Sequence, residues 1–149
     1  MATWNEIESA VPEFAARVRA VLDAHKHKTI ATLRADGSPR ISGIEVRFDG
    51  DHLTFGSMPG ARKGADLRRD PRFALHSASV DPPDGGSWAG DAKVSGRAVY
   101  VGPLDGDVPG DLFRADLDDV VLTGLNDEGT ALVIETWRSR HGLRRVERA

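Results

Sequence analysis

Apolar and polar positions alternate with a helical period in residues 3–25. The apolar positions of this segment fall at spacings of four, three, four and four: Ile7, Val11, Phe14, Val18 and Leu22. Such spacing places these side chains on one side of a helix, where they can pack against the rest of the protein. Thr3 and Glu6 have the spacing of a capping box, and Pro12 predicts a break with a second helical piece beginning near it. The pattern therefore predicts an interrupted helix within residues 1–27.

After the helical segment the pattern changes to the alternation of β-strands. Residues 28–34 alternate, the Asp-Gly-Ser turn at 36–38 follows, and residues 39–48 form the predicted partner strand. A second Asp-Gly turn at 49–51 leads into a third strand at 52–55. Three strands joined by tight turns predict an antiparallel meander.

The second half of the chain reads as further strands separated by loops rich in glycine and proline. The predicted strands are 72–79, 91–101, 120–123, 130–138 and an edge at 143–147. Residues 112–117 fit either a short strand or a helical turn, residues 79–90 and 102–111 read as loops, and Gly96 inside its strand predicts a bulge or a bend. Several short strands after one leading helix predict a single mainly β domain over residues 1–149. In it, residues 28–149 form a small closed β-barrel with flanking helices.

The composition limits the class of protein. With 149 residues, 40% hydrophobic and 29% charged, the chain has the size and balance of one globular domain. The net charge of −3 gives no support to nucleic-acid binding, and the absence of cysteine excludes disulfides, a thiol nucleophile and cysteine-ligated metal. No apolar run approaches the ~20 residues of a membrane span, and the first residues lack a signal-peptide pattern. We expect a soluble, cytoplasmic protein without a nucleic-acid or membrane partner.

Side-chain motifs for catalysis are absent from the sequence. It contains no G-x-S-x-G elbow, no H-E-x-x-H, no Walker loop and no G-x-G-x-x-G. Its five histidines lack the spacing of metal ligands, so no metal site is predicted, and His76 is expected to be half-buried with its hydrogen bonds satisfied. No catalytic residue can be named. If the protein is an enzyme, its reactive atoms belong to a bound cofactor.

The segment with the strongest indication of function is residues 53–75. An apolar run ends at Gly56-Ser57, and a glycine-containing turn then brings Arg62 and Lys63 to the start of a short helix. Backbone N–H groups at a helix start, a hydroxyl and two cations together suit a phosphate group. The alternative interpretation is a basic helix start that simply faces water.

This segment resembles the phosphate-binding segment of the pyridoxamine 5′-phosphate oxidase-like split barrels, which bind flavins and deazaflavins. The likeness rests on Ser57, on Arg62-Lys63-Gly64 and on residues 67–75, with the sequence LRRDPRFAL. Residues 30–40 also resemble the family's opening hairpin, and the likeness extends over about residues 26–101. The resemblance implies a split β-barrel of the FMN-binding type. It also implies a homodimer with two cofactor sites between the protomers.

The resemblance further implies roles for individual residues. Ser57, Arg62 and Lys63 would hold the cofactor phosphate. Arg40 matches an arginine that oxidase-type members direct to the same group. The cofactor would be FMN or the deazaflavin coenzyme F420, which the sequence does not distinguish. The longer anionic tail of a deazaflavin would meet further arginines such as Arg68 or Arg69.

Two tryptophans and a basic C-terminal cluster are further candidates. Trp88 and Trp137 could stack on a planar ring, or could equally plug the barrel or anchor an interface. The basic cluster that follows the second tryptophan comprises Arg138, Arg140, Arg144 and Arg145. In a dimer it would extend the site of the neighbouring subunit; alternatively it is a solvated edge strand that discourages aggregation.

Two positions depart from the oxidase pattern. Glu45 stands near the place of a basic residue close to the ring, and Asp91 stands near the place of an amide side chain at the ring edge. These departures argue against oxidation of pyridoxamine phosphate itself. The expected function is therefore that of a flavin- or deazaflavin-dependent oxidoreductase that transfers hydride to or from a small organic substrate. The alternatives are a non-catalytic carrier or sensor for FMN, haem or another planar ligand, and an interaction protein that has lost the ligand.

Overall fold

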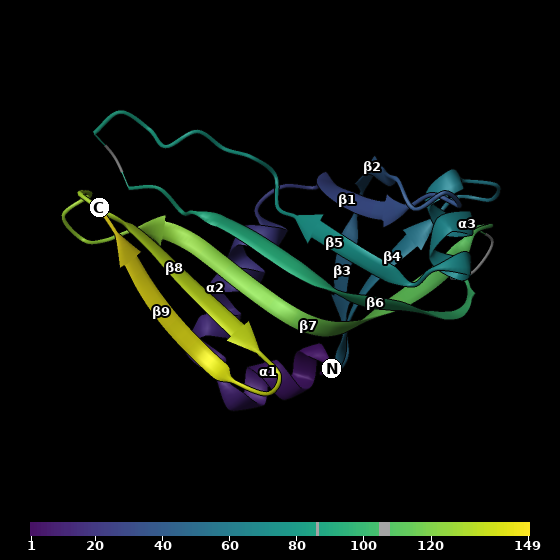
Figure 1. The fold of residues 1–149 in the computed structure, drawn as a ribbon, viewed down its shortest axis with the longest axis horizontal. Helices are drawn as coiled ribbons and strands as arrows, with labels where there is room; N and C mark the ends of the chain where they lie inside the picture. The colour runs from purple at the N-terminus through teal and green to yellow at the C-terminus, as the bar shows by residue number, and fades with distance from the viewer. Residues whose placement is uncertain (86, 105–107) are drawn as a thin grey trace.

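The computed structural model describes residues 1–85, 87–104 and 108–149. Within these residues the chain forms three helices and nine strands (Figure 1). In chain order they are α1 (Trp4–Ala10), α2 (Pro12–Asp23), β1 (Lys28–Leu33), β2 (Pro39–Ile44), β3 (Val46–Asp49), β4 (His52–Ser57), α3 (Arg62–Arg69), β5 (Arg72–His76), β6 (Asp91–Pro103), β7 (Asp111–Leu125), β8 (Leu132–Arg138) and β9 (Gly142–Arg148).

The predicted interruption of the N-terminal helix is confirmed. The Thr3 hydroxyl accepts a hydrogen bond from the Glu6 backbone N–H at 3.2 Å, and the Glu6 carboxylate accepts one from the Thr3 N–H at 3.1 Å. Val11 caps the end of α1 and the start of α2, and Pro12 is the first residue of α2, where a missing N–H costs nothing. The predicted apolar stripe lies in the core, with Val11 half-buried and its other members fully buried.

The expectation of one strand over residues 39–48, and of a three-strand meander, is wrong. The chain bends at Glu45, so that β2 pairs with β1 and β3 pairs with β4. In the hydrogen-bonded order β2-β1-β5-β6-β7-β4-β3, the consecutive strands β2 and β3 occupy the two ends. Because one short bend joins both ends of this order, the sheet curls round into a barrel. The sequence pattern gives no sign of the bend, because inward and outward side chains alternate without interruption through it. The inward positions on its two sides are Ile44, Val46 and Phe48.

Residues 111–125 form one long strand, β7, in place of the predicted short element at 112–117 and separate strand at 120–123. This strand pairs with β6 along almost its whole length, and the shift of register between Ser95 and Gly96 lets both strands continue past the irregularity. The bulge predicted from Gly96 is thereby confirmed. A Cβ on Gly96 would collide with the backbone carbonyl oxygen of Asp116 on β7, so only glycine fits there.

Smaller differences concern the loops. Strand β5 ends at His76, earlier than the predicted end at residue 79. The predicted loop at 102–111 begins later, because β6 extends to Pro103, and part of it, residues 105–107, lies outside the described residues.

The core fills the barrel and the space between the sheet and the first two helices. Its largest fully buried side chains include Trp4, Phe14, Ile30, Leu53 and Phe113. Strands β8 and β9 extend the sheet beyond β7, and α3 lies at the end of the molecule away from them (Figure 1). Among the helices of the described residues, none is both long and apolar enough to cross a membrane.

Candidate functional site

The predicted phosphate-binding turn connects the end of β4 to the start of α3. Ala61 precedes the first helical residue in an extended conformation and makes no side-chain capping bond. The backbone N–H groups in the first turn of a helix have no partner within the helix. The start of α3 therefore offers donors and a partial positive charge, as an anion requires.

The hydroxyl of Ser57 lies against the first turn of α3. The Ser57 side chain is buried, and its hydroxyl donates a weak hydrogen bond to the Met58 carbonyl oxygen at 3.3 Å. A Cβ on Gly64, the third residue of α3, would collide with this hydroxyl. The glycine of the Arg62-Lys63-Gly64 sequence therefore makes room for the serine that the sequence analysis assigned to the same site.

The two predicted cations occupy the first two positions of α3. Arg62 is exposed. Lys63 is half-buried, and its ammonium donates to the backbone carbonyl oxygen of Gly43 on β2 at 3.0 Å. The side chain of Lys63 thus reaches from α3 to β2. The structure brings Ser57, Arg62 and Lys63 together around one helix start.

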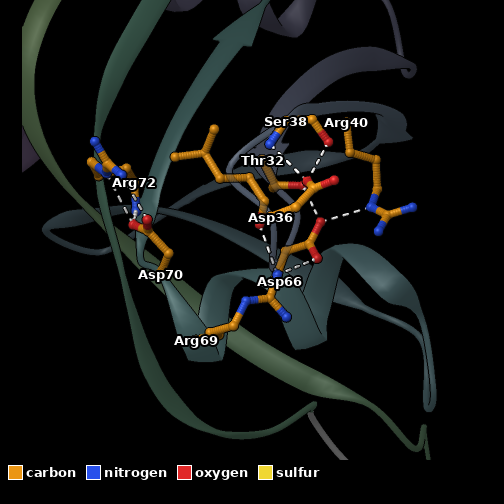
Figure 2. Close-up of polar contacts among 9 residues, drawn as sticks. Thr32, Asp36, Ser38, Arg40, Asp66, Arg69, Asp70 and Arg72 are labelled. Carbon is orange, nitrogen blue, oxygen red and sulfur yellow. Dashed lines mark hydrogen bonds and ion pairs between the residues drawn. The ribbon is translucent and has the colours of Figure 1, made fainter.

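Arg40 on β2 is held by a buried carboxylate that the sequence analysis did not identify. Its Nε donates to Asp66 Oδ2 at 2.7 Å, and the same oxygen accepts from the Thr32 hydroxyl at 2.8 Å. The other oxygen of Asp66 accepts from Arg69 Nη2 at 2.8 Å (Figure 2). Arg40 is predicted to direct its side chain to the cofactor phosphate. The anion that it contacts in the structure is Asp66.

Asp66 joins α3 to the first hairpin. The residue is 2% exposed and lies on the inner side of the helix. Burial alone would raise the pKa of this carboxyl, but hydrogen bonds from Arg40, Thr32 and Arg69 outweigh it and lower the pKa to about 2. Asp66 is therefore ionised at neutral pH. The sequence shows an acid among the basic residues of α3, but only the fold shows that Thr32 and Arg40 lie opposite it.

A second carboxylate lies close to the site. Asp111 at the start of β7 forms an ion pair with Arg68 at 3.5 Å, and one of its oxygens would lie 3.8 Å from a Cβ on Gly64. The Arg68 guanidinium also stacks over the Tyr100 ring at 4.1 Å from its centroid. The site is thus cationic at the start of α3 and mixed in charge at its margin.

The two predicted ring-stacking tryptophans lie away from α3. The Trp88 indole donates to the Val80 carbonyl oxygen at 3.0 Å and lines a groove of about 770 Å³ between α2, the end of β7 and the β8–β9 hairpin. Trp137 on β8 is 6% exposed and belongs to the hydrophobic core. Within one chain neither residue joins the cluster at α3, and their contact with a planar ring stays a prediction.

The two positions that depart from the oxidase pattern differ in their surroundings. Glu45 is exposed at the bend between β2 and β3 and lies 3.6 Å from Lys26. Asp91 is half-buried beside His76, at 4.0 Å, and its Oδ1 is buried without a hydrogen-bond partner in the described part of the chain. His76 is half-buried, as expected, with Nδ1 2.6 Å from the Ser77 carbonyl oxygen.

The outer face of the sheet carries a shallow groove of about 400 Å³ across strands β1, β2, β5, β6 and β7. Ala31, Ile41, Ala74 and Val121 form much of its apolar lining, and Ile41 is 75% exposed. His76 lies at the margin of this groove. In residues 1–85, 87–104 and 108–149, no three histidine, aspartate or glutamate side chains are grouped so as to hold a metal ion.

Comparison with known proteins gives the family and the fold. The family model described as pyridoxamine 5′-phosphate oxidase matches residues 14–115. No curated protein sequence matches the chain.

Solved structures share the fold at low sequence identity. PhzG from Burkholderia lata, solved with tetrahydrophenazine-1-carboxylic acid, has a TM-score of 0.63 and 12% identity over 96% of this chain and 91% of that one. A pyridoxamine 5′-phosphate oxidase-related, FMN-binding protein from Nostoc punctiforme has a TM-score of 0.62 and 13% identity over 100% and 98%. HutZ from Vibrio cholerae, a haem storage protein, has a TM-score of 0.52 and 15% identity over 73% and 90%.

At such identities these structures support the fold alone. They confirm the predicted mainly β split barrel. The family match covers more than half of the sequence and includes the turn with Ser57, Arg62 and Lys63. The chain belongs to the pyridoxamine 5′-phosphate oxidase family.

Proposed function

We propose that the protein is an oxidoreductase that uses FMN or a deazaflavin and transfers hydride to or from a small organic substrate. The observation that supports the proposal is the convergence of the Ser57 hydroxyl, the uncapped start of α3 and the Arg62-Lys63 pair. In the proposal these groups hold the cofactor phosphate. Membership of a family with FMN-binding members gives the second line of support.

The donor set fits a phosphate group. Arginine provides a planar fork, lysine a point charge and serine a hydroxyl, and all three types bind phosphate in proteins. Asp111 opposes this charge at the margin, but its ion pair with Arg68 neutralises part of it. The same donors would not suit a cation or a neutral apolar ligand.

The role of this chain is then to bind and orient. A bound flavin or deazaflavin supplies the hydride-transfer chemistry. Arg62 and Lys63 would anchor the phosphate, and the buried Ser57 hydroxyl would donate a hydrogen bond to it. Anchoring at one end limits the positions that the attached ring can take, which favours reaction through orientation.

The proposal is tested by spectroscopy and by replacement of the two cations. The purified protein is titrated with FMN and with coenzyme F420, and binding is followed by absorbance and fluorescence. We expect Arg62→Ala with Lys63→Ala to weaken affinity by about 100-fold, since two charge-assisted contacts are lost, while the free energy of unfolding changes little. Unchanged affinity in this double variant, or no binding of either cofactor by the wild type, would reject the site.

A matched control uses two cations away from α3. Arg19→Ala with Arg148→Ala removes the same charge from exposed positions on α2 and β9. We expect cofactor affinity in this control to stay within about threefold of the wild type, because exposed charges at a distance are screened by salt.

A non-catalytic carrier or sensor for FMN, haem or another planar ligand is the second candidate. It is favoured by the acidic residues Glu45 and Asp91, which depart from the oxidase pattern. Turnover separates the two: oxidation or reduction of the bound cofactor by added small substrates supports the enzyme, and stable binding without turnover over a broad substrate panel supports the carrier.

We further propose that the protein is a homodimer that uses the outer groove across β1, β2, β5, β6 and β7 as its interface. The apolar lining and the exposed Ile41 would be covered by the same surface of a second copy, as in a two-fold interface. Sedimentation velocity of Ile41→Glu tests this. We expect monomers, whereas Val108→Glu, the same change at an exposed apolar residue that does not line the groove, should leave a dimer.

A further inference from the structure

Asp66 is a buried carboxylate on α3, about one helical turn after Arg62 and Lys63. It is 2% exposed and accepts three hydrogen bonds, from Thr32 on β1, Arg40 on β2 and Arg69 of its own helix, at 2.8, 2.7 and 2.8 Å. Arg69 also donates to the Leu33 carbonyl oxygen at 2.8 Å. This carboxylate therefore connects α3 with both strands of the first hairpin.

The contact with Arg40 uses only part of the guanidinium. Nε is the atom that donates to Asp66, and one terminal nitrogen lies on the side of the guanidinium away from Asp66 in Figure 2. The Arg40 side chain is 19% exposed, so it is held inside the protein at one end and reaches the surface at the other. Three residues further along β2, the Gly43 carbonyl oxygen accepts a hydrogen bond from the Lys63 ammonium. The side chain of Lys63 therefore reaches the strand that carries Arg40.

We propose that Asp66 is a positioning residue for the phosphate site, which holds Arg40 by its Nε so that the terminal nitrogen turned away from Asp66 is directed at the bound phosphate. The inference rests on the proposed function, because it assigns a role at the site proposed there. It adds a residue that does not touch the ligand and that carries the same sign of charge as the ligand.

The proposal makes an unusual electrostatic prediction. Removing the charge of Asp66 makes the site more positive by one unit, and Coulomb attraction alone would then strengthen phosphate binding. If Asp66 acts by positioning Arg40, removing its charge should weaken phosphate binding. An asparagine at 66 has only one acceptor oxygen for three donors, and its NH₂ group would face an arginine, so the guanidinium of Arg40 is released. We expect the loss of positioning to exceed the gain in charge.

The experiment measures the affinity of four proteins for FMN and for riboflavin, which has the same ring without the phosphate. They are the wild type, Asp66→Asn, Arg40→Gln and the double variant. Where the wild type prefers a deazaflavin, coenzyme F420 and the deazaflavin without its phosphate-bearing tail are used. Urea unfolding of each protein confirms that it is folded under the binding conditions.

We expect Asp66→Asn to weaken FMN binding by about tenfold and riboflavin binding by less than about twofold, as for the loss of one charge-assisted contact. The double variant should bind FMN within about twofold of Arg40→Gln alone, because two changes that act through one contact are not additive. Equal or tighter FMN binding by Asp66→Asn overturns the proposal. Additive losses in the double variant also overturn it, since Asp66 would then act independently of Arg40.

Arg40→Lys gives a test that does not depend on the folding of Asp66→Asn. Lysine keeps the charge but has a single nitrogen, which cannot donate to Asp66 and at the same time reach beyond it. We expect Arg40→Lys to lose FMN affinity as strongly as Arg40→Gln, and wild-type affinity in Arg40→Lys overturns the proposal. If the wild type binds neither cofactor, the proposed function fails as well. If it binds FMN but these variants match it, only the role of Asp66 fails.

Discussion

The hydroxyl of Ser57 occupies the space that a side chain at residue 64 would need. This contact joins the end of β4 to the first turn of α3, and it explains why a glycine follows the two cations of the site. A glycine at the third position of a helix is otherwise unfavourable by about 1 kcal/mol relative to alanine. Because of this contact, residue 64 is a glycine at a position where the helix alone would favour alanine.

Gly64→Ala should remove the Ser57 hydroxyl from the site without unfolding the protein. The new Cβ forces the hydroxyl into another rotamer, while alanine improves the helix. We expect FMN affinity to fall by about tenfold, as in Ser57→Ala, and the free energy of unfolding to change by less than about 1 kcal/mol. Isothermal titration and urea unfolding measure the two quantities. The double variant should bind like each single one; an additive loss would show that the two residues act separately.

Gly96→Ala should destabilise the barrel strongly. The Cβ would meet the backbone carbonyl oxygen of Asp116, which cannot move without disturbing the β6–β7 pairing. We expect a loss of about 1–3 kcal/mol in the free energy of unfolding, the range for overpacking in a well-packed interior. Gly124→Ala on β7 is the matched control, because a Cβ there has open space around it. Equal stabilities of the two variants would contradict the bulge geometry.

The ion pair between Arg17 and Glu135 should contribute measurably to stability. Two hydrogen bonds of 2.6 and 2.7 Å connect α2 to β8, and Glu135 is only 12% exposed. In a double-mutant cycle with Arg17→Ala and Glu135→Ala we expect a coupling energy of about 1 kcal/mol, reduced by the exposure of the arginine. The pair Arg19–Asp23, at 3.6 Å with both side chains nearly half exposed, should show less than about 0.5 kcal/mol. A larger coupling in the second pair would contradict this ranking.

The stability of the protein should fall in acid partly through Asp66. Its pKa is lowered from the ordinary 3.8 to about 2, because hydrogen bonds from Arg40, Thr32 and Arg69 outweigh the effect of burial. A carboxyl with a lowered pKa stabilises the folded state above pH 3.8, and this contribution is lost as the pH falls toward 2. We expect the free energy of unfolding of the wild type to decrease more steeply over that range than that of Asp66→Asn. Urea unfolding across the range measures both, and Asp118→Asn, at an exposed site on β7, should follow the wild type.

Features that depend on neighbouring residues were predictable from the sequence. The capping box of Thr3 and Glu6, the helix start at Pro12 and the bulge at Gly96 each follow from residues close in the chain. The turn with Arg62 and Lys63 was predictable for the same reason, since its hydroxyl, glycines and cations lie within a few positions.

Features that depend on distant segments were not predictable. The bend at Glu45 leaves the alternation of β2 and β3 intact, so the pattern gives no sign that the two strands have different partners. Asp66 receives its partners from residues 26 and 34 positions earlier. Without the fold, an acid among basic residues reads as a solvated helix position.

The bend at Glu45 also bears on how fast the protein folds. Because of this bend, β3 and β4 do not pair with the first hairpin. Strand β4 pairs with β3 on one side and with β7 on the other, where Thr54 lies opposite Arg114, sixty positions later in the chain. Contacts between residues close in the chain cannot close the barrel. The entropy cost of bringing β4 and β7 together must be met before their pairing stabilises the fold. Barrel closure is therefore expected to limit the rate of refolding, in the millisecond-to-second range typical of topologies dominated by non-local strand pairs.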